Sequence, residues 1–263
     1  MATDTEIADA QALVADRIDV LTLLEGSRLP KREIVDELGY SRSTVNRAIT
    51  QLADAGLVDD APRGCQTTFV GSLLATQYRA YRETVTDIVR ARDVLRVLPT
   101  DANLPATALR DAEVVTPEGP HPYDPYHAVE DVLDSPGADG DVRVYVPSFS
   151  NPRGLELARH LAQTVPLEIV FTDVLVAELT ENRTEEVETL CEIDGFTGYR
   201  TAGGPRYTLI IADSESGTQG AIVTHTADRN LGGVIVTEDA AALRWMERRY
   251  AEIRAESEPL EPL

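Results

Sequence analysis

A long helical pattern followed by a cluster of prolines divides this chain into parts. Apolar residues recur at helical spacing from Ser72 to about Leu98. Six prolines follow within 27 residues, at positions 99, 105, 117, 120, 122 and 125. Proline cannot continue a helix, so the helix has to end there. We expect an N-terminal domain over residues 1–71, a connecting helix over 72–98 and a C-terminal domain over 99–263.

Charge is spread unevenly between these parts. The chain has 45 acidic and 24 basic residues for a net charge of −21, and Lys31 is its one lysine. Residues 1–98 hold 12 basic and 15 acidic residues, whereas residues 99–263 hold 12 and 30. Acidity of this kind keeps a protein hydrated in molar salt, where the Debye length is about 3 Å. The composition therefore predicts the protein of a halophile.

The sequence predicts a cytoplasmic location without membrane contact. Its first residues, from Met1 to Glu6, are acidic where a secretion signal is basic and then apolar, and no run of about 18 uncharged apolar residues follows. Cys65 and Cys191 have neither metal-ligand spacing nor the pattern of a disulfide framework. We expect no metal and no cofactor.

Residues 11–55 show the pattern of three helices. The first runs from Gln11 to Glu25, and Gly26 stops it. The second begins at Pro30 and ends at Gly39, and Ser41 is placed to cap a third helix that reaches about Ala55. The short turn between the second and third helices predicts a helix-turn-helix unit.

The third helix has one apolar and one polar face. Its apolar face carries Val45, Ala48, Ile49 and Leu52, and its polar face carries Ser43, Asn46, Arg47 and Thr50. Between Arg42 and Leu52 there is no acidic residue. A face without carboxylates can approach phosphates, and Asn and Arg pair with adenine and guanine edges. This face is the candidate surface for double-stranded DNA.

Two short strands follow, at 57–60 and 66–70, around a loop that contains Arg63. With these strands, residues 11–75 resemble the archaeal winged helix-turn-helix transcription regulators. The resemblance rests on the run Leu-Gly-Tyr-Ser-Arg-Ser-Thr-Val-Asn-Arg-Ala-Ile at 38–49, on Ala-Gly-Leu-Val at 55–58 and on the wing. It implies major-groove contacts by Arg42, Ser43, Asn46, Arg47 and Thr50, and a contact of Arg63 with the backbone or minor groove. Asp59 and Asp60 depart from a typical basic wing.

The connecting helix carries a heptad seam. Its members are Leu74, Tyr78, Tyr81, Val85, Ile88, Arg92 and Leu95, spaced by alternating steps of four and three. Two copies packed along this seam would form a homodimer, with the helices that read DNA about 34 Å apart. The alternative is that this heptad seam docks on the C-terminal domain of its own chain.

The C-terminal part alternates between strand and helix patterns. We expect strands at 142–146, 167–171, 207–211, 219–224 and 233–236, and helices at 152–163, 174–179, 185–190 and 239–253. The expected fold class is therefore α/β or α+β, with an N-terminal winged helix-turn-helix, a long connecting helix and a C-terminal mixed α/β domain.

The whole arrangement resembles archaeal regulators in which a winged helix precedes a sensor-like domain, the group of the methanogenesis and filament-formation regulatory proteins. The residues that carry this resemblance lie at 207–213, 220–223, 232–236 and 241–247. The unit 142–171 also resembles the start of the phospholipase-D-like domain of sugar-sensing archaeal regulators. The resemblance implies a regulator whose C-terminal domain senses a ligand or dimerises.

The sequence does not predict an enzyme. Phospholipase-D chemistry needs His-x-Lys, and the one lysine lies in the N-terminal domain. The sequence contains no His-x-x-x-His pair and no Gly-x-Ser-x-Gly elbow. An enzyme with a fused winged helix is therefore the weakest of the three classes that we consider.

The best candidate for an effector site follows the strand at 142–146. Ser148, Ser150, Asn151 and Arg153 lie where that strand leads into a helix, whose free N–H groups favour a small anion. Thr172, after the next strand, would lie beside them if the two strands are parallel neighbours. We expect a DNA-binding regulator that responds to an effector. The alternative is a protein-interaction adaptor whose winged helix binds no DNA.

Overall fold

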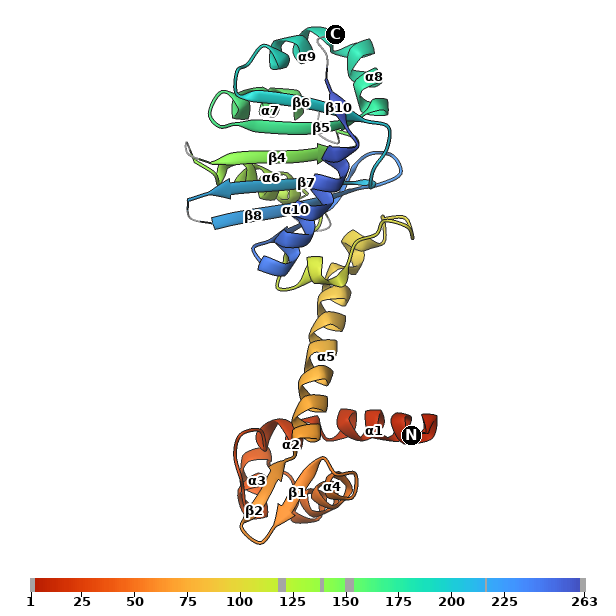
Figure 1. Ribbon diagram of the computed structural model, residues 1–263, viewed down its shortest axis with the longest axis vertical. Coiled ribbons are helices and arrows are strands. Elements are labelled where there is room, and N and C mark those ends of the chain that lie inside the picture. Colours follow the sequence, from red (N-terminus) through yellow and green to blue (C-terminus); the bar gives the residue numbers. More distant parts are fainter. Residues whose placement is uncertain (1–2, 118–121, 138–139, 150–153, 216, 261–263) are drawn as a thin grey trace. The chain divides into compact units, whose positions relative to one another are not determined.

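The computed structural model describes the chain except for residues 1–2, 118–121, 138–139, 150–153, 216 and 261–263. It divides into two compact units, unit 1 over residues 1–83 and unit 2 over residues 84–263. Helix α5 (Phe69–Leu95) begins in the first and ends in the second (Figure 1).

Unit 1 is a helical domain with a two-stranded wing. Its elements before α5 are α1 (Asp4–Asp16), α2 (Ile18–Leu23), α3 (Lys31–Leu38), α4 (Arg42–Asp54), β1 (Val58–Ala61) and β2 (Gly64–Thr67). β1 and β2 pair antiparallel. The core is formed by apolar residues of all the helices and of the wing, including Leu21, Leu24, Ile34, Ile49 and Leu52.

The expectation of one first helix from Gln11 to Glu25 is wrong. The helix is interrupted at Arg17, whose φ of −125° and ψ of 20° are not helical. The Arg17 guanidinium donates to the Gln51 side chain of α4, at 3.1 and 3.3 Å. The break therefore lies where the first helices meet α4.

The wing needs a glycine at its tip. Gly64 has a φ of +124°, and a Cβ there would lie 2.8 Å from the backbone carbonyl of Leu29. Next to it, Leu29 and Cys65 exchange two backbone hydrogen bonds of 2.9 and 2.8 Å. The segment before α3 thus adds a bridge to the edge of the wing.

The boundary between the wing and α5 also differs from the expectation. The predicted strand over 66–70 is wrong at its end, because Phe69 and Val70 belong to α5. The Thr68 hydroxyl accepts a hydrogen bond from the Gly71 N–H at 3.1 Å and donates to the Gly56 carbonyl at 2.7 Å, as a helix cap does. The helix ends at Leu95 rather than at Leu98.

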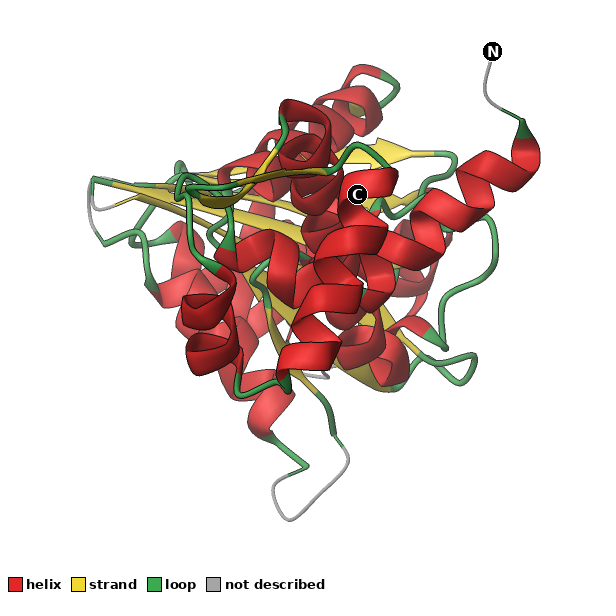
Figure 2. Ribbon diagram, turned by 90° about the horizontal axis from the view of Figure 1, so that it is seen from below, coloured by secondary structure: helices red, strands yellow, loops and turns green. Residues whose placement is uncertain are grey.

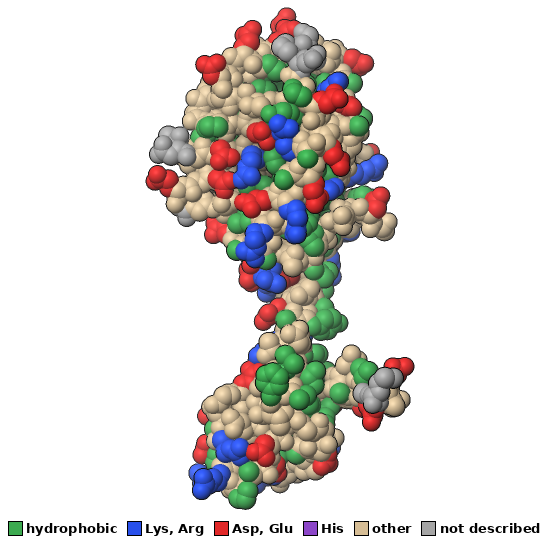
Figure 3. All heavy atoms as spheres, viewed as in Figure 1, with side chains coloured by type: hydrophobic (Ala, Val, Ile, Leu, Met, Phe, Trp, Pro, Cys, Tyr) green, Lys and Arg blue, Asp and Glu red, His purple; other side chains and the backbone are tan. Residues whose placement is uncertain are grey.

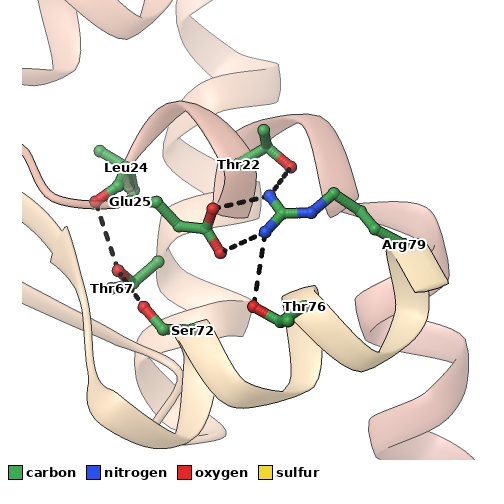
Figure 4. A network of polar contacts seen from close by, with 7 residues as sticks. All are labelled: Thr22, Leu24, Glu25, Thr67, Ser72, Thr76 and Arg79. Carbon is green, nitrogen blue, oxygen red and sulfur yellow. Dashed lines mark hydrogen bonds and ion pairs between the residues drawn. The ribbon is translucent and has the colours of Figure 1, made fainter. Parts of the chain in front are cut away.

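An ion pair joins the start of α5 to the end of α2 within unit 1 (Figure 4). Arg79 donates to both carboxylate oxygens of Glu25, at 2.6 and 3.1 Å. Its guanidinium also lies 3.4 Å from the hydroxyls of Thr22 and Thr76. Both charged side chains are about one third exposed or less, so the bidentate pair orients α5 on the helical core.

Unit 2 contains a sheet of eight strands in the order β10-β6-β5-β4-β7-β8-β9-β3. These are β3 (Glu113–Val115), β4 (Asp141–Val146), β5 (Leu167–Thr172), β6 (Phe196–Thr201), β7 (Tyr207–Ser214), β8 (Gly217–His225), β9 (Leu231–Thr237) and β10 (Glu258–Pro259). β4, β5 and β6 are parallel neighbours, and the other pairs are antiparallel. The strands fan out as one twisted sheet (Figure 2).

Helices cover both faces of this sheet. α6 (Asp124–Asp134), α7 (Gly154–Ala162), α8 (Asp173–Asn182) and α9 (Thr184–Cys191) pack with Val142, Ile169, Ile210 and Val223 on one face. The end of α5, the short helix η1 (Ala106–Leu109) and α10 (Ala240–Ala255) pack with Tyr145, Leu209, Ile222 and Ile235 on the other. Alternate residues of each strand thus enter different cores.

The expected fold class is confirmed, with additional elements and with different bounds for several expected ones. All five expected strands exist, and the structure adds β3, β6, β10 and α6. The helix expected at 152–163 is described from Gly154 to Ala162, and residues 152–153 lie outside the described part. The domain bounds at 71 and 98 stay a prediction.

We predict that Gly71→Ala destabilises unit 1. A Cβ at this position would lie 2.0 Å from the Leu57 carbonyl oxygen, so the first turn of α5 has to move. The free energy of unfolding of unit 1 should fall by about 1–3 kcal/mol, although alanine favours helices. Circular dichroism during denaturant unfolding measures this change. Gln77→Ala, at an exposed position of α5, is the control, and an equal effect of both would contradict the prediction.

Candidate functional site

The polar face of α4 is built by a capped and anchored helix. The Ser41 hydroxyl accepts the Thr44 N–H at 3.1 Å, which satisfies one of the free donors at the helix start. Val45, Ala48, Ile49 and Leu52 are at most 1% exposed and fix the helix on the core of unit 1. Tyr40, in the preceding turn, donates to the Asp19 carboxylate of α2. The helix is therefore rigidly oriented, with its other face in solvent.

The structure places every predicted DNA-contacting residue at the surface of unit 1. Arg42, Ser43, Asn46, Arg47 and Thr50 are exposed on α4, and Arg63 is exposed at the wing tip. Their role in binding stays a prediction.

Two acidic residues of the wing are neutralised by neighbouring bases. Asp59 pairs with Arg28 at 2.7 Å, and Asp60 pairs with Lys31 at 2.6 Å. The hydrogen bond from Lys31 lowers the pKa of Asp60. The acidic wing is thus balanced within unit 1, and Arg63 has no ion-pair partner among the residues that the structure describes.

A basic groove between α3 and α4 adds residues that sequence reasoning missed. Lys31 and Arg32 line it from α3, and Arg42 and Asn46 line it from α4. Its volume is about 330 Å³. Lysine and arginine beside the acid-free stretch 42–52 of α4 can contact the phosphate backbone. Helical spacing alone could not bring these residues together, because they belong to different helices.

The predicted effector residues fall partly outside the described chain. Ser150, Asn151 and Arg153 lie in the segment that the structure does not describe. Ser148 and Thr172 are brought to one edge of the sheet, because β4 and β5 are parallel neighbours. The Thr172 hydroxyl donates to the Pro147 carbonyl at 3.1 Å and accepts the Leu175 N–H at 3.3 Å. Thr172 therefore caps α8 and ties it to the end of β4.

Ser148 and Thr172 line a groove of about 560 Å³, which we call the edge groove. It lies at the carboxyl ends of β4, β5 and β6, where ligands bind in open α/β sheets. Sequence reasoning missed Arg206 and Arg229, which also line it. None of its described lining residues is acidic, although this half of the chain carries 30 acidic residues. Arg229 pairs with Glu178, whereas Arg206 has no ion-pair partner in the described residues.

The chain that follows α5 forms one wall of the edge groove. Val97, Leu98 and Pro99 line it. Val94 and Val97 pack closely on two glycines at the start of β9. A Cβ on Gly232 would lie 2.9 Å from Val97, and one on Gly233 would lie 2.6 Å from Val94. The end of α5 is thus seated beside the groove within unit 2.

The heptad seam is only partly available at the surface. Leu74 and Tyr78 pack against the core of unit 1, and Leu95 packs against a core of unit 2. Tyr81, Val85 and Ile88 are 63%, 39% and 40% exposed. Figure 3 shows apolar side chains gathered along α5. The middle of the helix therefore presents an apolar stripe.

His225 is a partly buried titratable group that lines the edge groove. Its Nε2 lies 3.0 Å from the Thr208 hydroxyl. Burial lowers the pKa of His225 to about 4, so the ring is neutral at physiological pH. Within the described part of the chain, no group of three His, Cys, Asp or Glu side chains could hold a metal ion. None of the described helices has the length and apolarity needed to cross a membrane.

Two protein families match the chain. Residues 5–103 match the HVO_A0261 N-terminal domain, and residues 122–256 match the middle domain of the methanogenesis regulatory protein FilR1. The second match covers more than half of the sequence, so the chain belongs to the FilR1 family of regulatory proteins. The resemblance stated from the sequence is confirmed. No curated protein matches the sequence.

Solved structures resemble this chain only distantly. The archaeal chromatin protein TrmBL2 has 10% identity and a TM-score of 0.41, over 96% of this chain and 93% of its own. The phospholipase D family member Nuc of Salmonella typhimurium has 10% identity and a TM-score of 0.42, over 57% and 97%. These TM-scores lie below 0.5, so neither likeness carries a conclusion about this chain.

We predict that acidification destabilises unit 2 through His225. The folded-state pKa lies below the unfolded value, so this stability is complete above about pH 6.5 and falls as the pH drops toward 4. Between pH 7 and pH 5 this residue should cost about 2 kcal/mol of unfolding free energy. Fluorescence of Trp245, the one tryptophan, reports the unfolding of unit 2. His225→Gln should flatten the pH dependence, and an unchanged slope would contradict the prediction.

Proposed function

We propose that this chain is a sequence-specific, DNA-binding transcription regulator of a halophilic archaeon, acting in the cytoplasm and controlled by an effector bound to unit 2. In this proposal α4 enters the major groove and Arg63 contacts the backbone or the minor groove. One observation supports this proposal most directly. Between Arg42 and Leu52 the exposed face of α4 carries no acidic residue and bears Arg42, Asn46 and Arg47, in a chain whose net charge is −21. Asp54, the last residue of the helix, is its one exposed acid.

Electrostatics supports binding by this face despite the acidic chain. In molar salt the Debye length is about 3 Å, so the carboxylates of unit 2 exert little repulsion on a duplex bound to unit 1. Contacts at hydrogen-bond distance between arginine and base edges or phosphates survive this screening better than long-range attraction. Specific recognition at high salt therefore needs a close and acid-free surface, which residues 42–52 of α4 and the basic groove supply.

Membership in a family of regulatory proteins supports a role in transcription. The alternative is a protein-interaction adaptor, in which the winged helix contacts a protein. We favour DNA because the polar face of α4 is hydrophilic and basic, whereas the core of a protein interface is depleted in charge. The proposal assigns no catalytic chemistry to the chain.

We further propose that two copies pair along the exposed stripe of α5, formed by Tyr81, Val85 and Ile88. These residues keep heptad spacing at the centre of the helix, and pairing would remove their apolar surface from water. A pair of winged helices doubles the contacts with a duplex, which suits two half-sites.

The effector in this proposal is a small anion in the edge groove. Arg206 and the acid-free lining favour negative charge there. A ligand in this groove touches Val97, Leu98 and Pro99, which continue α5. Ligand binding can then shift the equilibrium between a DNA-competent and a DNA-incompetent position of α5, provided that these two states differ in their affinity for the ligand.

We predict that Arg47→Glu abolishes specific DNA binding. The substitution removes a donor to base edges and adds a carboxylate at the centre of the polar face, so affinity should fall at least about tenfold. Electrophoretic mobility shift with the promoter of its own gene, at high KCl, measures the effect. Arg244→Glu makes the same charge change at an exposed position of α10 and should bind as the wild type does. Failure of the wild type to bind duplexes at any salt concentration would favour the adaptor.

We predict that the double substitution Val85→Glu and Ile88→Glu yields a monomer at molar KCl. Two carboxylates per chain would be buried in the seam, where an unpaired charge is costly. Light scattering coupled to size-exclusion chromatography gives the mass. Arg90→Glu, on the opposite side of α5, should leave the dimer intact. A monomeric wild type would show that the stripe does not pair copies.

A further inference from the structure

Unit 2 contains a second cavity beside the edge groove, which we call the apolar pocket. It lies between α6, α7 and the sheet, and its volume is about 120 Å³. Aliphatic side chains form most of its wall, among them Leu133, Val144, Leu161, Ile169, Ile210 and Val223. Ser148 and His225 line both cavities. The pocket and the groove therefore adjoin at these two side chains.

The two cavities differ in chemistry. The pocket could hold a group about the size of a benzene ring, since an apolar cavity of about 150 Å³ binds benzene. Its charged lining residue is the exposed Glu130, whereas the charged lining residues of the groove are Arg206 and Arg229. A ligand that spans both would thus place its apolar part in the pocket and its negative charge in the groove.

We propose that the effector of this chain is a small carboxylate with a compact apolar body, of the arylacetate or branched-chain type. Its ring or alkyl group would occupy the apolar pocket, and its carboxylate would lie beside Ser148 in the edge groove, attracted by Arg206. This proposal rests on the proposed function, since it names the ligand class of the same regulator.

The polar groups at the boundary fit a single acidic head. The Ser148 hydroxyl is a neutral hydrogen-bonding group, and the imidazole of His225 is held uncharged by burial. Arg206 is exposed and supplies the positive charge. Sugars and nucleotides are disfavoured, because the aliphatic wall would leave their hydroxyl groups without partners.

Ala158 provides a way to fill the pocket. It lines the pocket from α7 and is 7% exposed, so a phenylalanine side chain there would take the space of the ligand's body. Arg206→Gln removes the charge from the groove and keeps a polar side chain. Arg159→Gln makes the same charge change on the exposed face of α7 and is the matched control.

Isothermal titration of the full-length protein at molar KCl tests the proposal, with phenylacetate and isovalerate as probes. We expect saturable binding of at least one of them, and at least tenfold weaker binding of acetate, which lacks the body, and of phenylacetamide, which lacks the charge. Arg206→Gln should weaken binding at least fivefold and Arg159→Gln should not. Ala158→Phe should abolish binding, with thermal unfolding checked to show that it folds.

Several results would overturn this assignment. One is that neither probe binds at millimolar concentration. Another is that phenylacetamide binds as tightly as phenylacetate, and a third is that the Arg206→Gln and Arg159→Gln proteins have equal affinity for the probe. DNA is absent from these titrations, so failure here with intact promoter binding would refute the ligand class alone. Carboxylate binding by a protein that binds no duplex would instead refute the proposed regulator.

Discussion

A single helix contributes to the cores of both units, and the rest of the structure depends on this arrangement. Ala75 of α5 is buried in unit 1, and Ala91 and Val94 are buried in unit 2. At its start, the Thr68 cap, the close approach of Gly71 to Leu57 and the Arg79–Glu25 pair fix the helix on the winged helix. At its end, Gly232 and Gly233 have no side chains and so leave room for the side chains of Val94 and Val97. Any change in unit 2 that reaches Val94 therefore acts on a helix shared with unit 1.

Charge is partitioned so that the acidity of the chain does not oppose the proposed DNA binding. Unit 2 carries most of the negative charge, and Figure 3 shows acidic side chains scattered among basic ones on its surface. In unit 1 the acidic wing residues pair with Arg28 and Lys31, and α4 carries no acidic residue before Asp54, its last position. In unit 2, the described lining of the edge groove likewise contains no acidic residue. In both places, local absence of carboxylates marks a surface suited to an anion.

Much of this architecture could be predicted from the sequence, because local signals were strong. Ser41 and the spacing of Val45, Ala48, Ile49 and Leu52 predicted α4 and its orientation. The start of α5 was misplaced, because Phe69 and Val70 look like strand residues and the capping role of Thr68 is visible only in the fold. The three-residue β3 exists through its pairing with β9, a contact between distant segments.

The candidate sites, too, could be predicted only where a local sequence pattern defines them. The exposed side of α4 follows from helical periodicity, so its residues could be named from the sequence. The edge groove could not, because Arg206 and Arg229 are far from Ser148 in the chain and meet it only through the order of the strands. Likewise the salt bridges that neutralise Asp59 and Asp60 join residues about 30 positions apart.

Cross-linking of the full-length protein to duplex DNA tests the central claim most directly. A promoter duplex carrying photoreactive 5-iodouracil is irradiated with the protein at molar KCl, and the attached peptides are mapped by mass spectrometry. We expect cross-links in residues 42–54 and around Arg63. Cross-links confined to residues 84–263, or their absence when the duplex is saturated with protein, would contradict DNA binding by the polar face of α4.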